Sequence, residues 1–177
     1  GVDLGGTKIS VARITGQECE KESYSLIPSD GTEAEVLTVV VDTISKVIDK
    51  NVKGIGIGVP SVVDQQMGIV YDVQNIPSWK EIPLKAILEN HFRLTVHVNN
   101  DANCFALGEF YFGQGKEQDS FVGITIGTGI AGGVIINKLL YNGFNTGAGE
   151  FGMLPYLDQN FEHYCSGQFF KKVHRIA

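Results

Sequence analysis

Residues 2–9 read VDLGGTKI, and this short stretch decides the fold that the sequence predicts. Apolar residues flank the turn Gly5-Gly6-Thr7, which predicts two strands, over residues 2–4 and 8–14, joined by a tight turn. Glycine lets a ligand approach the backbone closely, and successive N–H groups in such a turn can bind one anion. We expect that anion to be a phosphate, with Thr7 adding a hydroxyl donor and Lys8 a positive charge.

A second stretch repeats this pattern. Residues 124–131 read ITIGTGIA and superimpose on residues 2–9 without a gap, so Thr128 and Gly129 form a second candidate phosphate turn. Either turn alone could be an ordinary hairpin. The pair favours a duplicated fold whose halves each aim a phosphate turn into one cleft.

The second turn also matches a dinucleotide pattern. Residues 127–132 fit G-x-G-x-x-G, and Glu150 lies about twenty residues further on. That fingerprint requires a helix directly after the loop. Residues 133–136 read GVII, which predicts a strand, so we reject a dinucleotide site.

The remaining chain alternates strands and helices, which predicts an α/β architecture. Thr32 and Glu35 form a capping box at the start of one helix, and Pro83 suits the first turn of another. A break at residues 113–115 is the expected boundary between a lobe over 1–113 and a second lobe over 114–177. Further strands are expected over 19–27, 54–59, 69–71, 95–98, 121–126 and 133–136, and helices over 32–48, 83–91, 101–112 and from near Phe169 to the end.

Composition excludes several classes of protein. The net charge is -6 and the basic residues are scattered, which argues against a nucleic-acid surface. No apolar run approaches the ~18 residues of a membrane span. Cys19, Cys104 and Cys165 are odd in number and far apart, which predicts reduced thiols in the cytoplasm. The chain opens on a strand without Met, so we expect a piece of a longer protein.

Three acidic residues are candidates for chemistry. Asn100 and Asp101 follow the strand at 95–98, at the edge where ligands of α/β folds bind. Asp101 could be a helix N-cap, or a base that accepts the proton of a substrate hydroxyl. Asp3, as an unpaired carboxylate buried on a strand, would need a partner such as Mg²⁺, bound directly or through water. Glu150 could be a solvated loop charge.

As a set, these motifs closely resemble the ROK family, named for repressors, open reading frames and sugar kinases. The resemblance covers residues 2 to about 170. It implies the actin-like ATPase (ribonuclease H-like) fold, a duplicated α/β fold with two lobes around a cleft, of which the second is incomplete here. The motifs that carry it are Asp3-x-Gly5-Gly6-Thr7-Lys8, Gly56-x-Gly58-x-Pro60, Val63-Asp64, Asn100-Asp101-Ala102-Asn103, Leu107-Gly108-Glu109, Thr125-x-Gly127-Thr128-Gly129-Ile130 and Ala148-Gly149-Glu150-x-Gly152.

The resemblance also implies a function. It predicts a glucokinase-like enzyme that uses ATP and Mg²⁺ to phosphorylate a hydroxyl of a hexose or N-acetylhexosamine, as a homo-oligomer. Asp101 would be the base, with Asn100, Asp101 and Glu150 as sugar ligands and Ser61 and Asn75 on the sugar side. The two glycine turns would hold the ATP phosphates.

This sequence departs from the family pattern in three places. Ser61 stands where glycine is common, and Met153 where histidine is common. Residues 163–170 read HYCSGQFF in place of a cysteine-rich segment, and a sugar-binding Glu expected there has no clear counterpart. One cysteine cannot complete a zinc site, so we expect no zinc. The aromatic residues that would pack in place of the metal are Phe161, Tyr164, Phe169 and Phe170.

Two other functions stay open. Some relatives of this family are sugar-responsive transcriptional regulators, whose DNA-binding module would precede Gly1 and is absent from this chain. A sugar-binding fold without catalysis is the other, although Asp3, Asp101 and both glycine turns speak against it. If the protein is a kinase, residues 1–177 alone are expected to be inactive.

Overall fold

The chain folds into two compact units. The computed structural model describes residues 1–73 and 75–174, so the expected helical end at 175–177 lies outside the described residues. Unit 1 comprises Gly1–Asp101 and unit 2 comprises Ala102–Ala177. The packing therefore divides the chain directly after Asp101, the first residue of the helix at 101–112, and not after Gly113, where the boundary was expected. No helix among the described residues is long and apolar enough to span a bilayer.

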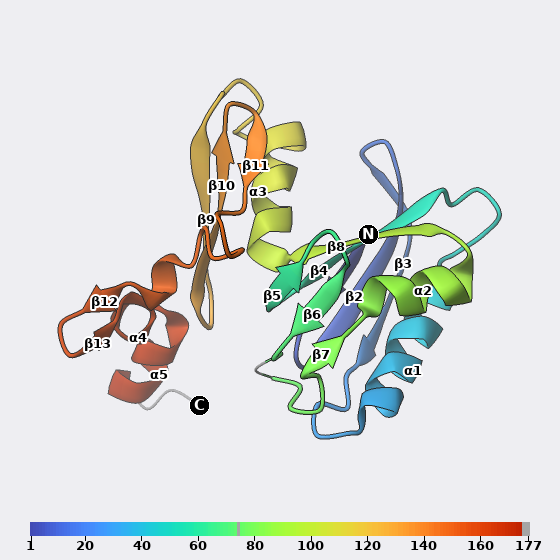
Figure 1. Ribbon diagram of the computed structural model, residues 1–177, viewed down its shortest axis with the longest axis horizontal. Coiled ribbons are helices and arrows are strands. Elements are labelled where there is room, and N and C mark those ends of the chain that lie inside the picture. The colour runs from blue at the N-terminus through green and yellow to red at the C-terminus, as the bar shows by residue number, and fades with distance from the viewer. Residues whose placement is uncertain (74, 175–177) are drawn as a thin grey trace. The chain divides into compact units, whose positions relative to one another are not determined.

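Unit 1 is built on a five-stranded mixed sheet with the order β3-β2-β1-β4-β8 (Figure 1). β1 (Val2–Leu4), β2 (Lys8–Thr15) and β3 (Glu18–Leu26) form an antiparallel meander. β4 (Gly54–Val59) pairs parallel to β1, and β8 (Thr95–Asn100) pairs parallel to β4. All five strands were predicted, and the predicted ends differ from the observed ends by two residues at most.

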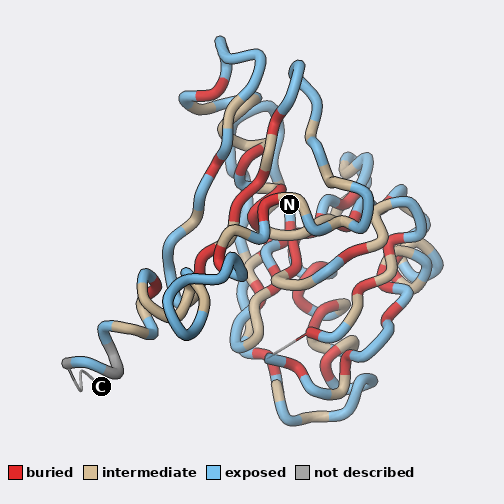
Figure 2. Tube along the Cα trace, turned by 60° about the vertical axis from the view of Figure 1, so that its left-hand side comes forward, coloured by how far each residue is buried: buried red, intermediate tan, exposed pale blue. Residues whose placement is uncertain are grey.

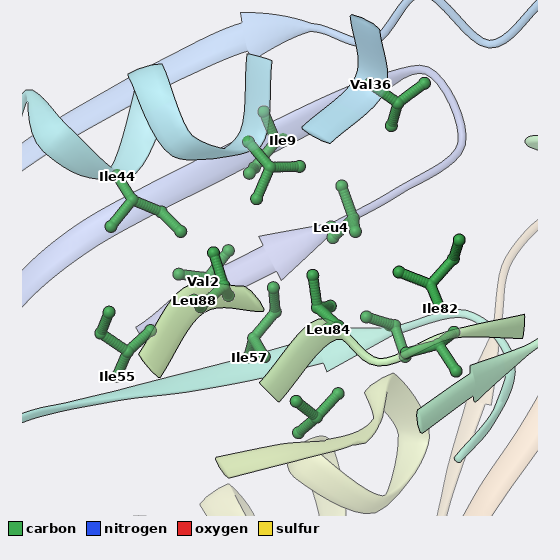
Figure 3. Packing of buried hydrophobic residues seen from close by; sticks show 14 of the residues in the cluster. Val2, Leu4, Ile9, Val36, Ile44, Ile55, Ile57, Ile82, Leu84 and Leu88 are labelled. Carbon is green, nitrogen blue, oxygen red and sulfur yellow. The ribbon is translucent and has the colours of Figure 1, made fainter. Parts of the chain in front are cut away.

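Two helices cover one face of this sheet. α1 (Glu33–Ser45) opens with the predicted capping box, in which Thr32 N–H donates to Glu35 Oε2 at 2.8 Å and Glu35 N–H donates to Thr32 Oγ1 at 3.3 Å. α2 (Leu84–Phe92) begins after Pro83 and ends at Arg93, which adopts the left-handed conformation. Buried side chains of α1 and α2 pack between the helices and the strands (Figure 3), and they include Val36, Ile44, Leu84 and Leu88.

A small antiparallel sheet, of order β5-β6-β7, completes unit 1. It consists of β5 (Val62–Asp64), β6 (Ile69–Tyr71) and β7 (Glu81–Ile82). Of these three strands, only β6 was predicted. Val63, Val70 and Ile82 join the same buried cluster as the large sheet.

Unit 2 holds a three-stranded antiparallel sheet of order β11-β10-β9. It comprises β9 (Phe121–Ile126), β10 (Ile130–Ile136) and β11 (Leu139–Tyr141). β10 follows the glycine turn directly and no helix does, which confirms the rejection of the dinucleotide fingerprint. Short elements follow: η1 (Phe151–Met153), β12 (Pro155–Tyr156), β13 (Gln159–Asn160), α4 (Phe161–Cys165) and α5 (Gly167–His174).

α3 (Asp101–Phe112) packs on β9 and β10. A Cβ on Gly133 would lie 2.5 Å from Ala106 Cβ and 2.8 Å from Ala102 O, so only glycine permits this approach of helix and strand. This packing explains why α3 belongs to unit 2.

The hydrophobic core lies in unit 1. Every member of the large buried cluster comes from residues 2–98, and Figure 2 marks such positions in red. Among the described residues of unit 2, the buried apolar side chains are small in number: Ala102, Ala106, Ile130 and Ile135. Its sheet instead leaves large apolar side chains exposed, among them Val122, Ile124, Ile126, Ile136 and Leu139.

Candidate active site

Three parallel strands bring the candidate residues of unit 1 to one edge. Asp3 pairs with Gly58, and Gly58 pairs with Asn99, so β1, β4 and β8 end side by side. The carboxyl end of β1 leads into the turn Gly5-Gly6-Thr7, that of β4 into Ser61, and that of β8 into Asp101. Ligands of α/β folds bind at such an edge.

The first glycine turn leaves two N–H groups for a ligand. Gly5 N–H donates to Lys8 O at 2.9 Å, which closes the hairpin and removes Gly5 as a donor. Within the described residues, the N–H groups of Gly6 and Thr7 have no hydrogen bond. Two neighbouring N–H groups without partners are what a backbone anion site needs. If the turn binds a phosphate, as expected, the N–H groups of Gly6 and Thr7 are the available donors.

Ser61 and Asn100 contact each other directly. Asn100 Nδ2 donates to Ser61 O at 3.2 Å, and Asn100 N–H donates to Asn99 Oδ1 at 2.8 Å. The Ser61 hydroxyl donates to the carbonyl of Tyr71 in β6. Ser61, which stands where the family commonly has glycine, thus donates a hydrogen bond that links the end of β4 to the small sheet. Its remaining polar capacity is as an acceptor.

Asp3 differs from its expected environment. It was expected to be a buried carboxylate, but it is exposed, because alternate residues of β1 face opposite sides and only Val2 and Leu4 face the core. Asp3 and Lys8 line a groove of ≈ 480 Å³ together with Ser10 and Tyr24. The desolvation argument for a metal therefore does not apply to Asp3.

An exposed carboxylate still fits one kind of magnesium site. Mg²⁺ keeps several waters and is commonly held by one or two carboxylates together with substrate phosphates. Among the described residues, no three acidic, histidine or cysteine side chains gather as an all-protein metal site. The donor set at Asp3 therefore suits an ion that arrives with a nucleotide.

The second glycine turn follows the plan of the first. Gly127 N–H donates to Gly129 O at 2.9 Å, and in the described part of the chain the N–H groups of Thr128 and Gly129 have no hydrogen bond. The strands pair differently, with Leu4 opposite Ile9 but Ile126 opposite Ile130. Four residues, 5–8, separate the last paired residues of the first hairpin, whereas three residues, 127–129, separate those of the second. The repeat is real in topology, but the gap-free superposition was wrong by one residue.

Glu162, in α4, contacts this turn and was missed by sequence reasoning. Its Oε2 accepts from Ile130 N–H at 2.9 Å and lies against Gly129, where a side chain would overlap it. On the other side, Gly167 N–H donates to Gly127 O at 2.7 Å. The start of α4 and the start of α5 thus hold the turn at both ends. The available signal was the N-cap Asn160, which predicts a helix start and places Glu162 in its first turn.

Glu150 lies in unit 2 on the same local scaffold as the second turn. It is exposed and directly precedes η1, where Met153 N–H donates to Glu150 O at 3.1 Å. Gly152 of η1 packs against the carbonyl of Ile130, at the end of the turn. Glu150 and the turn are therefore joined through one short helical segment.

Aromatic side chains pack where the family commonly has cysteines. Ring centroids lie 4.9 Å apart for Tyr156 and Phe161, 5.7 Å for Tyr156 and Tyr164, and 6.3 Å for Tyr164 and Phe169. The Tyr164 hydroxyl donates to Asp158, which lowers the pKa of Asp158 and raises that of Tyr164. We call Tyr156, Phe161, Tyr164 and Phe169 the aromatic cluster.

Comparison with known proteins identifies the relatives of this chain. The ROK family model matches residues 1–169. A glucokinase of Halalkalibacterium halodurans is 36% identical over 90% of this chain and 50% of its own length. An N-acetyl-D-glucosamine kinase of Haemophilus influenzae is 34% identical over 87% of this chain and 51% of its own. The chain spans about half the length of the curated relatives it matches.

The chain is also similar to a solved ROK kinase structure and to a transcriptional repressor. A ROK family glucokinase of Streptomyces griseus, in complex with glucose and AMPPNP, matches with a TM-score of 0.85 and 31% identity, over 97% of this chain and 58% of that one. The expected actin-like ATPase fold is thereby confirmed. A xylose repressor of Caldicellulosiruptor bescii is 32% identical over 86% of this chain and 40% of its own length.

Proposed function

This chain belongs to the ROK family, and from that premise we propose that its protein is a sugar kinase that transfers a phosphoryl group from ATP to a hydroxyl of a hexose or N-acetylhexosamine. One observation carries the proposal. The parallel strands β1, β4 and β8 end at one edge, which unites a glycine turn with two free N–H groups and the pair Asn100 and Asp101.

The residues of unit 1 have distinct roles in this proposal. Gly6 and Thr7 bind the phosphates through their N–H groups, and Lys8 adds positive charge beside them. Asn100 and Asp101 bind the sugar, and Asp101 accepts the proton of the attacking hydroxyl. Phosphoryl transfer depends mainly on positioning and on charge stabilisation, so a base of this kind mainly orients the nucleophile. Asp3 would help to hold a Mg²⁺ ion that arrives with ATP, and such an ion would neutralise charge on the phosphates.

Unit 2 supplies the other proposed ligands. Thr128 and Gly129 offer two further N–H groups to the phosphates, and Glu150 offers a carboxylate to a sugar hydroxyl. A site built to hydrogen-bond the hydroxyl groups of its substrate discriminates against analogues that lack them. The sugar is therefore recognised by the number and placement of its hydroxyls.

A substrate panel tests the proposal. The full-length protein is incubated with ATP, Mg²⁺ and one sugar at a time, and ADP release is followed with a coupled assay. We expect ADP release that depends on glucose or N-acetylglucosamine, above a blank without sugar. Absence of sugar-dependent ADP release across hexoses and N-acetylhexosamines would contradict the proposal.

A sugar-responsive regulator is the second candidate, favoured by the similarity to a xylose repressor. The discriminating observation is the sequence before residue 1. About sixty basic, helical residues there would be a DNA-binding module, because such a domain reads as a helical fold with clustered positive charge. Sugar-dependent DNA binding without phosphorylation would then replace the kinase proposal.

A further inference from the structure

Asn75 lies directly on the middle of the first glycine turn. A Cβ on Gly6 would overlap the Cβ of Asn75, and it would lie 3.0 Å from Asn75 Cγ and 3.2 Å from Asn75 Nδ2. A real Cβ does not approach other atoms so closely, so an alanine at position 6 would displace one of the two segments. The residue expected beside the sugar and the turn expected to hold phosphates are thus in van der Waals contact.

Described residues on either side of Asn75 are held by hydrogen bonds and by burial. Asp72 N–H donates to Lys80 O at 2.9 Å, and Val73 N–H donates to Trp79 O at 3.1 Å, which closes the segment at its base. Ile76 and Trp79 are each 0% exposed, so the segment is anchored in the core of unit 1. Asn75 itself is exposed and can reach a ligand.

The turn is also held in place. Gly5 N–H donates to Lys8 O at 2.9 Å, and Ile27 N–H donates to Thr7 O at 2.9 Å. Neither partner of the contact can swing away without breaking hydrogen bonds or exposing core side chains. A displacement on one side is therefore transmitted to the other, because the two segments are in contact.

We propose that Asn75 is a positioning residue for the phosphate turn, and that its contact with Gly6 couples sugar binding to ATP binding. This inference rests on the proposed kinase function. A sugar that shifts Asn75 on binding also shifts Gly6, whose N–H is the proposed phosphate donor, and in this proposal each substrate thereby strengthens binding of the other. The coupling is reciprocal by thermodynamic necessity.

The test is a double-mutant cycle in the full-length protein. In Gly6→Ala, the KM values for sugar and for ATP are both expected to rise by about tenfold to a hundredfold, the size of an overpacking defect. Asn75→Gly removes the three atoms that lie nearest to the new methyl group. In that background, adding Gly6→Ala is expected to change the KM for ATP by less than about twofold, as sites that share a contact are not additive.

Gly5→Ala is the matched control in the same turn. A Cβ on Gly5 would meet Lys8 O at 3.2 Å and no atom of Asn75, so Asn75→Gly is not expected to suppress its effect. If Gly6→Ala raises the KM for ATP as much in the Asn75→Gly background as in the wild type, the coupling proposal is wrong. The defect would then belong to the turn alone.

A second measurement separates this proposal from the kinase proposal. Isothermal titration of AMPPNP, with and without sugar, should show tighter nucleotide binding with sugar in the wild type and a weaker effect in Asn75→Gly. Equal sugar effects in both proteins would overturn the coupling while leaving the kinase proposal intact. A wild type without sugar-dependent turnover would contradict the kinase proposal. In that case, thermal unfolding still tests the contact, since Asn75→Gly should restore stability lost in Gly6→Ala.

Discussion

Asp101 occupies the junction where β8 ends and α3 begins. β8 runs to Asn100 and α3 starts at Asp101 without an intervening loop. A carboxylate in the first helical turn interacts favourably with the helix dipole. Its backbone is therefore fixed by a strand on one side and a helix on the other, which suits a group that must orient a hydroxyl.

Replacement of this carboxylate tests its role. Asp101→Asn keeps the shape and a hydrogen-bonding oxygen but cannot accept the proton. We expect kcat to fall by about 10²–10⁴-fold, the usual contribution of a general base, while sugar binding is retained. Asp42→Asn, which changes an exposed carboxylate on α1, is the control. Near-normal kcat in Asp101→Asn would mean that Asp101 serves only the helix terminus.

Glu162 gives a second prediction at the scale of a residue. In Glu162→Ala, the N–H of Ile130 loses the acceptor that lies 2.9 Å away, so its hydrogen exchange should become faster. Glu162→Gln keeps an acceptor oxygen and should stay close to the wild type. The amide of Val134, in the middle of β10, is an internal reference. Unchanged exchange at Ile130 in the alanine variant would show that this carboxylate does not hold the turn.

At the scale of elements, the capping box of α1 makes a measurable contribution to stability. Thr32→Ala removes the side-chain acceptor for Glu35 N–H and should lower the free energy of unfolding by about 0.5–2 kcal/mol. Thr38→Ala, in the exposed middle of the same helix, is the control, because alanine is the better helix former there. Equal losses in both variants would rule out a specific role for the cap. Denaturant unfolding measures both.

The same box gives a pH dependence. Hydrogen bonds from the Thr32 backbone and side chain lower the pKa of Glu35 below its ordinary value of 4.5. The stabilisation is therefore fully present above pH 4.5 and is lost as the pH falls through the lowered pKa. Glu35→Gln should remove this part of the acid dependence, whereas Glu33→Gln, which leaves the box intact, should retain it. If the loss of stability at acidic pH is the same in Glu35→Gln as in the wild type, Glu35 is not its source.

The aromatic cluster gives a prediction for the end of unit 2. Rings of Tyr156, Phe161, Tyr164 and Phe169 pack where a metal would otherwise join the segments. A chelator should therefore leave the melting temperature unchanged, whereas Tyr164→Ala should lower it. Elemental analysis should find no stoichiometric zinc. One zinc per chain, or a melting temperature that falls with the chelator, would refute this expectation.

At the scale of the whole molecule, the two sheets differ in how they are completed. β1 and β9 both precede a glycine turn, but β1 has β4 on its other side, whereas β9 ends its sheet among the described residues. The β9 side chains Val122, Ile124 and Ile126 are exposed. An exposed apolar edge strand is a template for pairing with another chain.

Residues 1–177 alone are therefore expected to self-associate and to lack useful kinase activity. Sedimentation velocity should show oligomers that Ile124→Lys reduces and that Tyr24→Lys, on the exposed edge strand β3, does not. Alignment of the two substrates supplies much of the catalysis, and it needs a completed site. The coupled ADP assay, run on residues 1–177 and on the full-length protein, should therefore give turnover only for the latter. Comparable turnover would show that residues 1–177 hold a complete site.

The sequence alone determined the local structure of this protein. The glycine turn at residues 5–7, the capping box at Thr32 and the strands of the large sheet all follow from short-range chemistry. Caps, turns and alternating apolar residues act over a few positions, so their pattern is visible without the fold. The sequence also placed Asn100 and Asp101 at the end of a strand, but the edge shared by β1, β4 and β8 emerged only from the pairing of the strands.

Tertiary structure alone decided which distant residues meet. The contact of Gly6 with Asn75, the hydrogen bond of Glu162 to Ile130 and the packing of Ala106 against Gly133 join residues far apart in the sequence. The exposure of Asp3 likewise depends on which face of β1 the helices cover. Such contacts depend on strand register and on the approach of whole elements, which no local pattern encodes because each is fixed by packing over the entire unit.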